Sequence, residues 1–560
     1  MGIPHLATSL QRFANHRALQ DESVVIDGPA LAHHMLNICR VNDASPPSYN
    51  LIAKSYIRWL DGLYSHRVII EAIYFDGHLP SWKRTVAVDD RDQLDDVFAT
   101  GTCGFRPFVE PSFFVPAIIE SLRQHPRYKT VTFVVPGEAD AYCAAHVSQM
   151  GGLVLTSDSD LLVYNLREGQ VAFLRDIYQN TYAQIVGSVF SPKQIGANLK
   201  LPPSEGLLRL AYEHSRAPQS TLSAIYQSCS REITNHSGYE KFSKLYELPA
   251  ISLWHPLDKK RFRRLVALDP RVSEVAVRIS SKISTNPDHA DDVHMYLPLL
   301  LEDSSSGSAW EHSRPLRQLA YAVFQLLNPR REMEVLEYRR VQDVSQKGRS
   351  VERLSTKQIE HLSEAFLIII ERMKSMAITY SISPWHLVGM AIEANECQTL
   401  EKQSFTWSIL QMRHDPSMTK TDRIPWNILH FSAHLQAALY SLRMLSQALI
   451  TFSEMSPDRG LPWSARQLQF ELRQLPPLAD FPDVDDAMQL LLLPSKDALI
   501  EEFGAALHLT MAPASESQTP AKTKKRAASE QREDGSRTSL PGSKRAMNAN
   551  MFGLLSIESD

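Results

Sequence analysis

Two patterns of apolar and polar residues alternate along the first third of the chain. Short apolar runs at 23–26, 68–75, 129–135 and 153–156 are typical of β-strands. Between them, apolar residues recur at helical spacing, as they do over 49–66 and 138–150. Strands that alternate with amphipathic helices predict a mainly parallel sheet covered by helices on both faces.

Beyond about residue 185 the strand pattern fades, and helical periodicity dominates. The segments with this periodicity are 191–199, 204–215, 313–327, 355–375, 425–453 and 465–475. After Pro513 large apolar residues become rare, and such a composition favours disorder. The sequence therefore predicts an α/β domain at 1–184, a largely helical region at 185–512 and a disordered tail at 513–560. Within the first domain, residues 89–116 show neither the strand pattern nor the helical pattern and are interpreted as an insertion or lid.

Composition narrows the class of protein. The chain has 560 residues, 43% hydrophobic and 22% charged, which suits several folded domains. The start of the chain lacks the pattern of a secretory signal, and no segment reaches the roughly 18 uninterrupted apolar residues of a membrane span. The five cysteines are scattered and show no metal-ligand spacing, so we expect reduced intracellular thiols and neither a disulfide framework nor a zinc site.

Acidic residues follow each of the four predicted strands at its carboxyl end. In an open α/β sheet this edge is where ligands bind. Carboxylates that converge there repel one another unless cations lie among them, and Mg²⁺ or Mn²⁺ prefer such oxygen ligands. Two such ions about 3.5–4 Å apart can bind the attacking and leaving oxygens of a phosphodiester. The candidate residues are Asp27, Asp76, Glu138, Asp140, Asp158 and Asp160.

Each of these acids also has a simpler interpretation. Asp27 and Asp76 each precede a glycine, as in many turns. An acid at Glu138 or Asp140 suits the first turn of a helix, and Asp158 or Asp160 suits a loop or a helix cap. Turn and cap chemistry does not, however, require acids after all four strands at one edge. The joint pattern therefore favours a metal site.

Five short blocks carry a resemblance to a known family. They resemble the flap-endonuclease and XPG-type PIN-like nucleases, and more closely their Asteroid-domain branch. The blocks are 1–3, 24–27, 73–77, 136–141 and 156–162, within about the first 175 residues. The resemblance implies a PIN-like fold and structure-selective cleavage of DNA or RNA with two Mg²⁺ ions. It assigns Asp27, Asp76, Glu138 and Asp140 to one ion, and Asp158 and Asp160 to the other.

The sequence also departs from that family. The nucleases it resembles carry a seventh acid in a block followed by a glycine-rich hairpin that binds duplex backbone. The comparable segment, 207–214, has no Asp and no such hairpin after it, and Glu213 is its one acid. An alternative function is therefore a catalytically weak PIN-like scaffold that binds partners, for example in RNA regulation.

Basic residues near the second strand are candidates for substrate binding. Lys83, Arg84 and Arg91 follow Asp76 in the sequence. In the resembled nucleases, basic residues at the base of the lid neutralise the scissile phosphate. The alternative is a solvated helix face.

The C-terminal tail differs in charge from the rest of the chain. The whole chain has a formal net charge of −4, whereas residues 511–550 contain eight Lys or Arg and four Asp or Glu. Exposed basic clusters such as 522–526 are typical of nuclear localisation signals or nucleic-acid contacts, so a nuclear location is favoured over a cytoplasmic one. The alternative is a merely solubilising tail. The apolar patch at 551–557 is a candidate docking motif for a protein partner.

Overall fold

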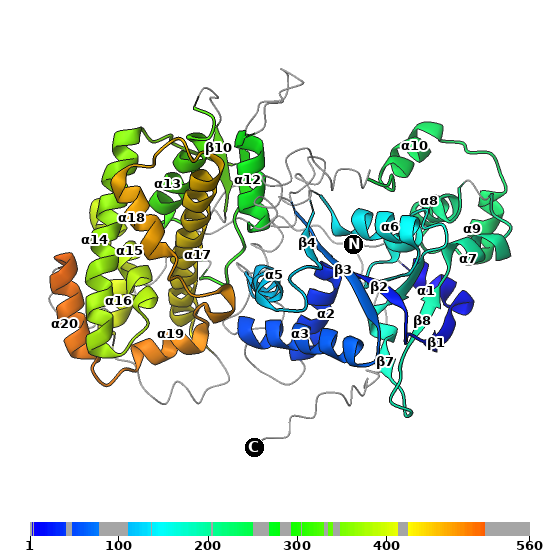
Figure 1. Ribbon diagram of the computed structural model, residues 1–560, viewed down its shortest axis with the longest axis horizontal. Coiled ribbons are helices and arrows are strands. Elements are labelled where there is room, and N and C mark those ends of the chain that lie inside the picture. The colour runs from blue at the N-terminus through cyan, green and yellow to red at the C-terminus, as the bar shows by residue number, and fades with distance from the viewer. Residues whose placement is uncertain are drawn as a thin grey trace, which may run out of the picture.

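The computed structural model describes residues 3, 5–40, 47–77, 110–135, 137–202, 205–249, 268–280, 293–303, 305–329, 334–339, 348–412 and 424–509. The N-terminal part is built on a β-sheet, and most of the rest of the described chain is helical (Figure 1).

The main sheet has eight strands within the described residues. Its order is β1-β8-β6-β5-β2-β3-β4, with β7 paired to β8. The run from β6 to β4 is parallel, whereas β8 is antiparallel to its neighbours. The strands are β1 (Asn15–Ala18), β2 (Ser23–Asp27), β3 (Ile69–Phe75), β4 (Thr132–Val134), β5 (Leu153–Thr156), β6 (Gln170–Phe173), β7 (Tyr178–Gln179) and β8 (Ile185–Phe190).

Side chains on the two faces of this sheet pack into different apolar clusters, because successive residues of a strand point to opposite faces. On β2, Val24 and Ile26 belong to one cluster and Val25 to the other. The first cluster includes α2 (Gly28–Arg40), α3 (Tyr49–Ser65) and α5 (Phe114–Gln124). On the opposite face lie α6 (Ala139–Met150) and the short segments α1 (Leu6–Leu10), η1 (Gln11–Phe13) and η3 (Ser159–Leu162), whereas η4 (Leu174–Asp176) packs with α2 on the first face. Both faces are covered, as parallel sheets require.

A small helical group follows the sheet. It comprises α7 (Pro192–Asn198), α8 (Leu208–Arg216), α9 (Leu222–Cys229) and α10 (His236–Lys244). Residues of this group pack on the α6 side of the sheet (Figure 1).

The C-terminal body contains a helical bundle with a small sheet of order β11-β10-β9. The longest described helix, α17, lies against α13, α15 and α18. The elements are α12 (Pro270–Ser280), β9 (Val293–Tyr296), α13 (Arg314–Gln325), β10 (Val335–Tyr338), β11 (Arg349–Val351), α14 (Thr356–Tyr380), α15 (Pro384–Thr399), α16 (Phe405–Gln411), α17 (Trp426–Met455), α18 (Trp463–Leu472), η7 (Leu478–Asp480), α19 (Val484–Leu491) and α20 (Lys496–Leu507).

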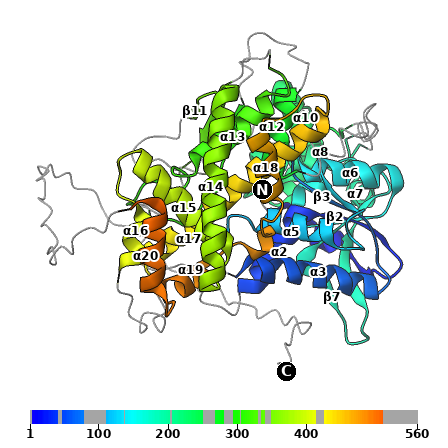
Figure 2. The same ribbon diagram turned by 60° about the vertical axis from the view of Figure 1, so that its left-hand side comes forward.

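The two parts share one apolar core, which extends from α2, α3 and α5 into the bundle (Figure 2). Phe113, at the start of α5, stacks on Tyr440 of α17 with ring centroids 4.7 Å apart. Arg443 of α17 donates to Glu120 of α5 at 2.9 Å. The bundle is therefore packed directly against the sheet domain.

The predicted fold class, a mainly parallel α/β domain followed by a largely helical region, is confirmed. The predicted boundary at residue 184 falls one residue before β8, which belongs to the main sheet. The region after residue 184 was predicted to be largely helical, so the strands β9, β10 and β11 were not predicted. The tail, 513–560, and most of the predicted lid lie outside the described residues. In the described part of the chain, no helix is long and apolar enough to cross a membrane.

Candidate carboxylate site

Four neighbouring parallel strands, in the order β4, β3, β2, β5, end at the same edge of the sheet. Asp27 is the last residue of β2, Asp76 follows β3, and Asp158 comes two residues after β5. Glu138 and Asp140 stand at the start of α6, directly after β4. From β2 the chain adds β3 and β4 on one side and then returns to place β5 on the other. The β2–β5 boundary is thus the kind of topological switch point at which α/β sheets bind ligands.

Hydrogen bonds hold Asp27 at that boundary. Its Oδ2 accepts from the Thr156 hydroxyl at 2.6 Å, and its Oδ1 accepts from the Ala30 backbone N–H at 3.1 Å. The hydroxyl oxygen of Thr156 in turn accepts from the Asp158 backbone N–H at 2.9 Å. The ends of β2 and β5 are therefore linked through a single buried threonine.

The other acids are positioned mainly by backbone donors. Asp76 accepts from the Ala139 N–H at 2.7 Å, which links the end of β3 to the start of α6. Asp158 caps η3 by accepting from the Asp160 N–H at 2.9 Å. Asp160 accepts from the Ile3 N–H at 2.8 Å, so the N-terminal segment lies beside the site. Each bond fixes a carboxylate relative to a strand end.

Burial and mutual repulsion set the electrostatics of the site. Burial raises the pKa of Asp27 to about 6, and Asp76 and Asp158 add to the rise against the two hydrogen bonds that lower it. Burial also raises the pKa of Asp140 well above its usual value. Four neighbouring acids raise it further, which are, from the largest effect to the smallest, Asp27, Asp158, Asp76 and Glu138. These carboxylates therefore lie within electrostatic reach of one another.

The pKa of Asp160 is also raised to about 6, by burial first and by Asp158 second. The structure thus brings all six predicted acids to one edge of the sheet. The negative charge gathered there is the kind that bound cations offset.

The oxygen ligands suit Mg²⁺ or Mn²⁺, but the acids do not form one tight cage. Among the described residues, no three of the six bring carboxylate oxygens within 4.8 Å of one another. Mg²⁺ commonly keeps several waters and binds one or two carboxylates, and that mode fits the wider spacing seen here.

Three residues near the acids were not predicted as part of the site. Thr156 could have been noticed as a polar residue that ends an apolar strand. Tyr246 hydrogen-bonds Asp160 and lies edge-on to Tyr164, with ring centroids 5.2 Å apart. Tyr246 comes from the segment after α10, so tertiary packing brings it to the site and no local pattern could reveal it.

Glu213, the candidate seventh acid, is engaged elsewhere. It forms an ion pair with Arg209 at 2.7 Å on the same helix, α8, and a longer one with Arg216 at 3.8 Å. Arg209 is almost fully buried, so its charge requires this partner. Glu213 therefore serves as the counter-ion of Arg209. Lys83, Arg84 and Arg91, the predicted phosphate-binding residues, lie outside the described residues.

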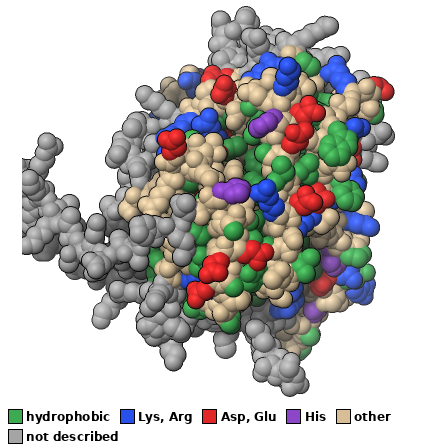
Figure 3. All heavy atoms as spheres, turned by 90° about the vertical axis from the view of Figure 1, so that its left-hand side faces the viewer, with side chains coloured by type: hydrophobic (Ala, Val, Ile, Leu, Met, Phe, Trp, Pro, Cys, Tyr) green, Lys and Arg blue, Asp and Glu red, His purple; other side chains and the backbone are tan. Residues whose placement is uncertain are grey.

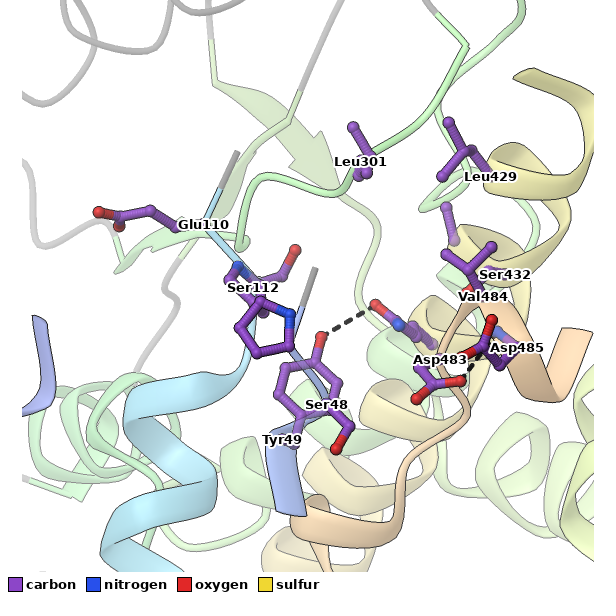
Figure 4. A pocket seen from close by; sticks show the side chains of 14 residues that line it. Ser48, Tyr49, Glu110, Ser112, Leu301, Leu429, Ser432, Asp483, Val484 and Asp485 are labelled. Carbon is purple, nitrogen blue, oxygen red and sulfur yellow. Dashed lines mark hydrogen bonds between the residues drawn. The ribbon is translucent and has the colours of Figure 1, made fainter. Parts of the chain in front are cut away.

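A separate pocket lies between the sheet domain and the bundle (Figure 4). It has a volume of about 60 Å³ and includes Tyr49 of α3 and Asp483 at the start of α19. The Tyr49 hydroxyl donates to Gln436 of α17 at 3.1 Å. None of the six acids lines it. This pocket belongs to the junction of the two parts and not to the carboxylate site.

Comparisons with known proteins agree with the family resemblance. A family model described as "XPG domain containing" matches residues 110–352, which include Glu138, Asp140, Asp158 and Asp160. Asteroid homolog 1 of Schizosaccharomyces pombe is 25% identical over 362 residues, which are 61% of this chain and 64% of that protein. The chain thus matches less than two thirds of the length of this relative.

Two solved structures of the catalytic core of Rad2 in complex with DNA substrate are also similar, each at 16% identity and over 48% of this chain. They are covered over 82% and 76% of their own chains, with TM-scores of 0.31 and 0.28.

Proposed function

We propose that this chain, which is similar to XPG and Asteroid proteins, is a divalent-metal-dependent phosphodiesterase that cleaves DNA or RNA at the carboxylate site. The observation that carries the proposal is the position of these acids at four neighbouring strand ends, where their charges add to the rise in the pKa of Asp27 and of Asp140. A turn or a helix cap needs a single acid. Several carboxylates gathered at one edge, whose charges raise the pKa of Asp27 and Asp140, are costly unless cations bind among them.

Two Mg²⁺ or Mn²⁺ ions, if bound by these acids, would supply an activated water and would neutralise charge on the scissile phosphate. Asp27, Asp76, Glu138 and Asp140 would hold one ion, and Asp158 and Asp160 the other. Thr156 keeps Asp27 and Asp158 in register across the switch point through its two hydrogen bonds. Lys83, Arg84 and Arg91 are proposed to bind the phosphate backbone of the substrate.

The test is cleavage of a panel of flapped, nicked, duplex and single-stranded DNA and RNA in Mg²⁺, Mn²⁺ or EDTA. We expect cleavage of at least one substrate in metal, and loss of that cleavage to the EDTA level in Asp158→Asn. The matched control is Asp21→Asn, since Asp21 precedes β2 at the opposite edge of the sheet and pairs with exposed Arg67. Equal activity of Asp158→Asn and the control would contradict the proposal.

The scaffold alternative is favoured by two observations. The candidate seventh acid, Glu213, is occupied by Arg209. The outer helices of the bundle expose large apolar side chains, Ile378 on α14 and Trp463 and Phe470 on α18, and the face in Figure 3 intersperses apolar residues with charges of both signs. Manganese binding at the acids without cleavage of any substrate in the panel would select this alternative.

We also propose a nuclear location, which rests on the basic tail at 513–560. Fusion of this tail to a fluorescent reporter is expected to enrich the reporter in the nucleus. Replacement of Lys524, Lys525 and Arg526 by Ala should remove the enrichment. An equal distribution of the two reporters would leave the tail as a solubilising segment.

A further inference from the structure

A second group of metal-binding side chains lies in the helical bundle, away from the carboxylate site. It consists of His312, in the turn before α13, and Glu393 and Cys397 on α15. Their ligand atoms all lie within 4.8 Å of one another. Glu393 and Cys397 are 2% and 1% exposed and His312 is half-buried, so this is not a surface cluster of acids.

The fold brings these three residues together from distant parts of the sequence. Glu393 and Cys397 are four residues apart on α15 and therefore share one face of the helix. Both α13 and α15 pack against α17, and this packing brings the turn that carries His312 to that face. The sequence spacing of the cysteines did not predict a zinc site, because the third residue stands 81 positions before Glu393 and belongs to another element.

The ligand types suit zinc more than magnesium. Imidazole, thiolate and carboxylate are the three protein ligands of Zn²⁺, whereas Mg²⁺ prefers oxygen alone. Cys397 Sγ lies 3.2 Å from Glu393 Oε1. Ligands on a tetrahedral zinc ion at its usual bond lengths lie about 3.3–3.8 Å from one another. The pair therefore needs little movement to share an ion. A thiolate and a carboxylate also balance the two positive charges in a buried place.

The simpler interpretation is that Glu393 caps α16. It accepts from the backbone N–H of Phe405 at 2.9 Å and of Thr406 at 3.2 Å, and from the Ser404 hydroxyl at 2.6 Å. This role explains Glu393 but not His312, whose buried Nδ1 has no hydrogen-bond partner among the described residues. A buried imidazole nitrogen without a partner destabilises the folded protein. A bound ion would remove that cost.

Bound zinc is also compatible with the capping role. The Cys397 thiol donates to Glu393 Oε1. When zinc binds, the thiol releases that proton to solvent, and the freed lone pair of Oε1 becomes available to the ion while the backbone bonds to α16 remain. The ring of His434 on α17 lies 5.2 Å from that of His312 and supplies a further imidazole beside the group.

We propose that His312, Glu393 and Cys397 bind a Zn²⁺ ion that ties the turn before α13 to α15 and α16. This site is structural and independent of the carboxylate site. Because the unfolded chain cannot present the three ligands together, zinc binding stabilises the folded bundle.

Cobalt substitution of the full-length protein tests the proposal, because a thiolate ligand gives Co²⁺ a charge-transfer band in the near ultraviolet that carboxylate ligands do not give. We expect the band in the wild type and its loss in Cys397→Ser. His312→Gln should weaken zinc affinity at least about tenfold. The matched control is Cys143→Ser, since Cys143 is buried beside Asp27 and Asp140 and is a thiol close to the other site.

Absence of the band in the wild type would overturn the proposal, as would its loss in Cys143→Ser with retention in Cys397→Ser. A measurement without variants covers the case in which Cys397→Ser does not fold. Zinc should slow alkylation of Cys397 in the wild-type protein, as mapped by mass spectrometry, and should leave alkylation of the half-buried Cys229 unchanged. Equal alkylation of Cys397 with and without zinc would also overturn it.

Discussion

Asp27→Asn is expected to lower metal-dependent cleavage by about 100-fold or more, because loss of even an indirect partner of a metal ligand costs 10–100-fold. The same variant should leave the metal-free protein equally stable or more stable at neutral pH. Loss of activity without loss of stability is what distinguishes a metal ligand from a turn residue or a cap at this position.

The stability effect has a definite pH dependence. The pKa of Asp27 rises from its usual 3.8 to about 6 because the carboxyl is buried. Between these two values the folded protein holds the proton more tightly than the unfolded chain does. The free energy of unfolding therefore falls as pH rises from about 4 to about 6, by about 3 kcal/mol for a rise of about two units. Asn carries no charge and escapes this loss.

Asp27→Asn also weakens the hydrogen bonding at this position. Asp27 accepts from both Ala30 and Thr156, and one of its two oxygens becomes an amide group in Asn. A lost hydrogen bond costs about 1 kcal/mol, so the net gain at pH 7.5 should be about 1–2 kcal/mol. At pH 4 the wild-type carboxyl is protonated, and the gain should disappear.

Urea unfolding in EDTA at pH 4 and pH 7.5 measures this difference, and titration with Mn²⁺ measures the loss of metal binding. Asp21→Asn is again the control, because Asp21 has a positive φ of 63° that Asn tolerates well. A large loss of stability in Asp27→Asn at pH 7.5 would show instead that the acid serves the fold.

The sequence could predict four of the five parallel strands, β2 to β5, and the acids that follow them, because both signals are local, whereas the parallel strand β6 was not predicted. A buried parallel strand is a short apolar run, and the acid that follows it is the next residue or the next few. β2 and Asp27 show this directly, since the run 23–26 and the acid are contiguous. The arrangement of the six acids then follows from strand order, which βαβ connections restrict.

The antiparallel part of the sheet was not predicted, for a physical reason. β1 is the polar run Asn15–Ala18, whose residues are exposed or half-buried, so it has no apolar pattern to detect. β8 contains Gly187 and Ser188 in its centre, which interrupt the apolar run. These strands are defined by pairing with each other, and pairing between distant segments leaves little trace in either segment alone.

Long-range polar contacts were likewise invisible in the sequence. Tyr246 reaches Asp160, and His312 reaches Cys397, only through the packing of segments that are far apart in the sequence. The same holds for Arg317 on α13. The helical pattern gives no reason to bury an arginine there, yet Arg317 is fully buried.

Arg317→Ala should cost about 3–5 kcal/mol of folding free energy, because it leaves a buried carboxylate without its counter-ion. Arg317 Nε and Nη2 donate to the two oxygens of Glu337 on β10 at 2.7 and 2.9 Å. The side chains of Arg317 and Glu337 are 0% and 1% exposed. Burial alone would raise the pKa of Glu337, but the Arg317 guanidinium outweighs it and holds that pKa below its usual value.

The same guanidinium also joins other parts of the bundle. Its Nη1 donates to Ser313 at 2.8 Å and to Ser441 of α17 at 3.1 Å, and Nη2 donates to the Trp310 carbonyl at 3.0 Å. Urea unfolding of Arg317→Ala should therefore show the full loss of folding free energy. The control is Arg349→Ala, which removes an exposed arginine 3.6 Å from Glu311 and should change stability by about 0.5 kcal/mol or less.

The double variant Arg317→Met, Glu337→Leu separates charge from packing. Removal of both charges leaves no unpaired ion, and apolar replacements of similar volume are often neutral or stabilising. We expect the double variant to recover most of the stability lost in Arg317→Ala, apart from the hydrogen bond that the Tyr321 hydroxyl donates to Glu337. A double variant as unstable as Arg317→Ala would show that the contacts to Ser313, Ser441 and Trp310, and not the ion pair, hold this part of the bundle together.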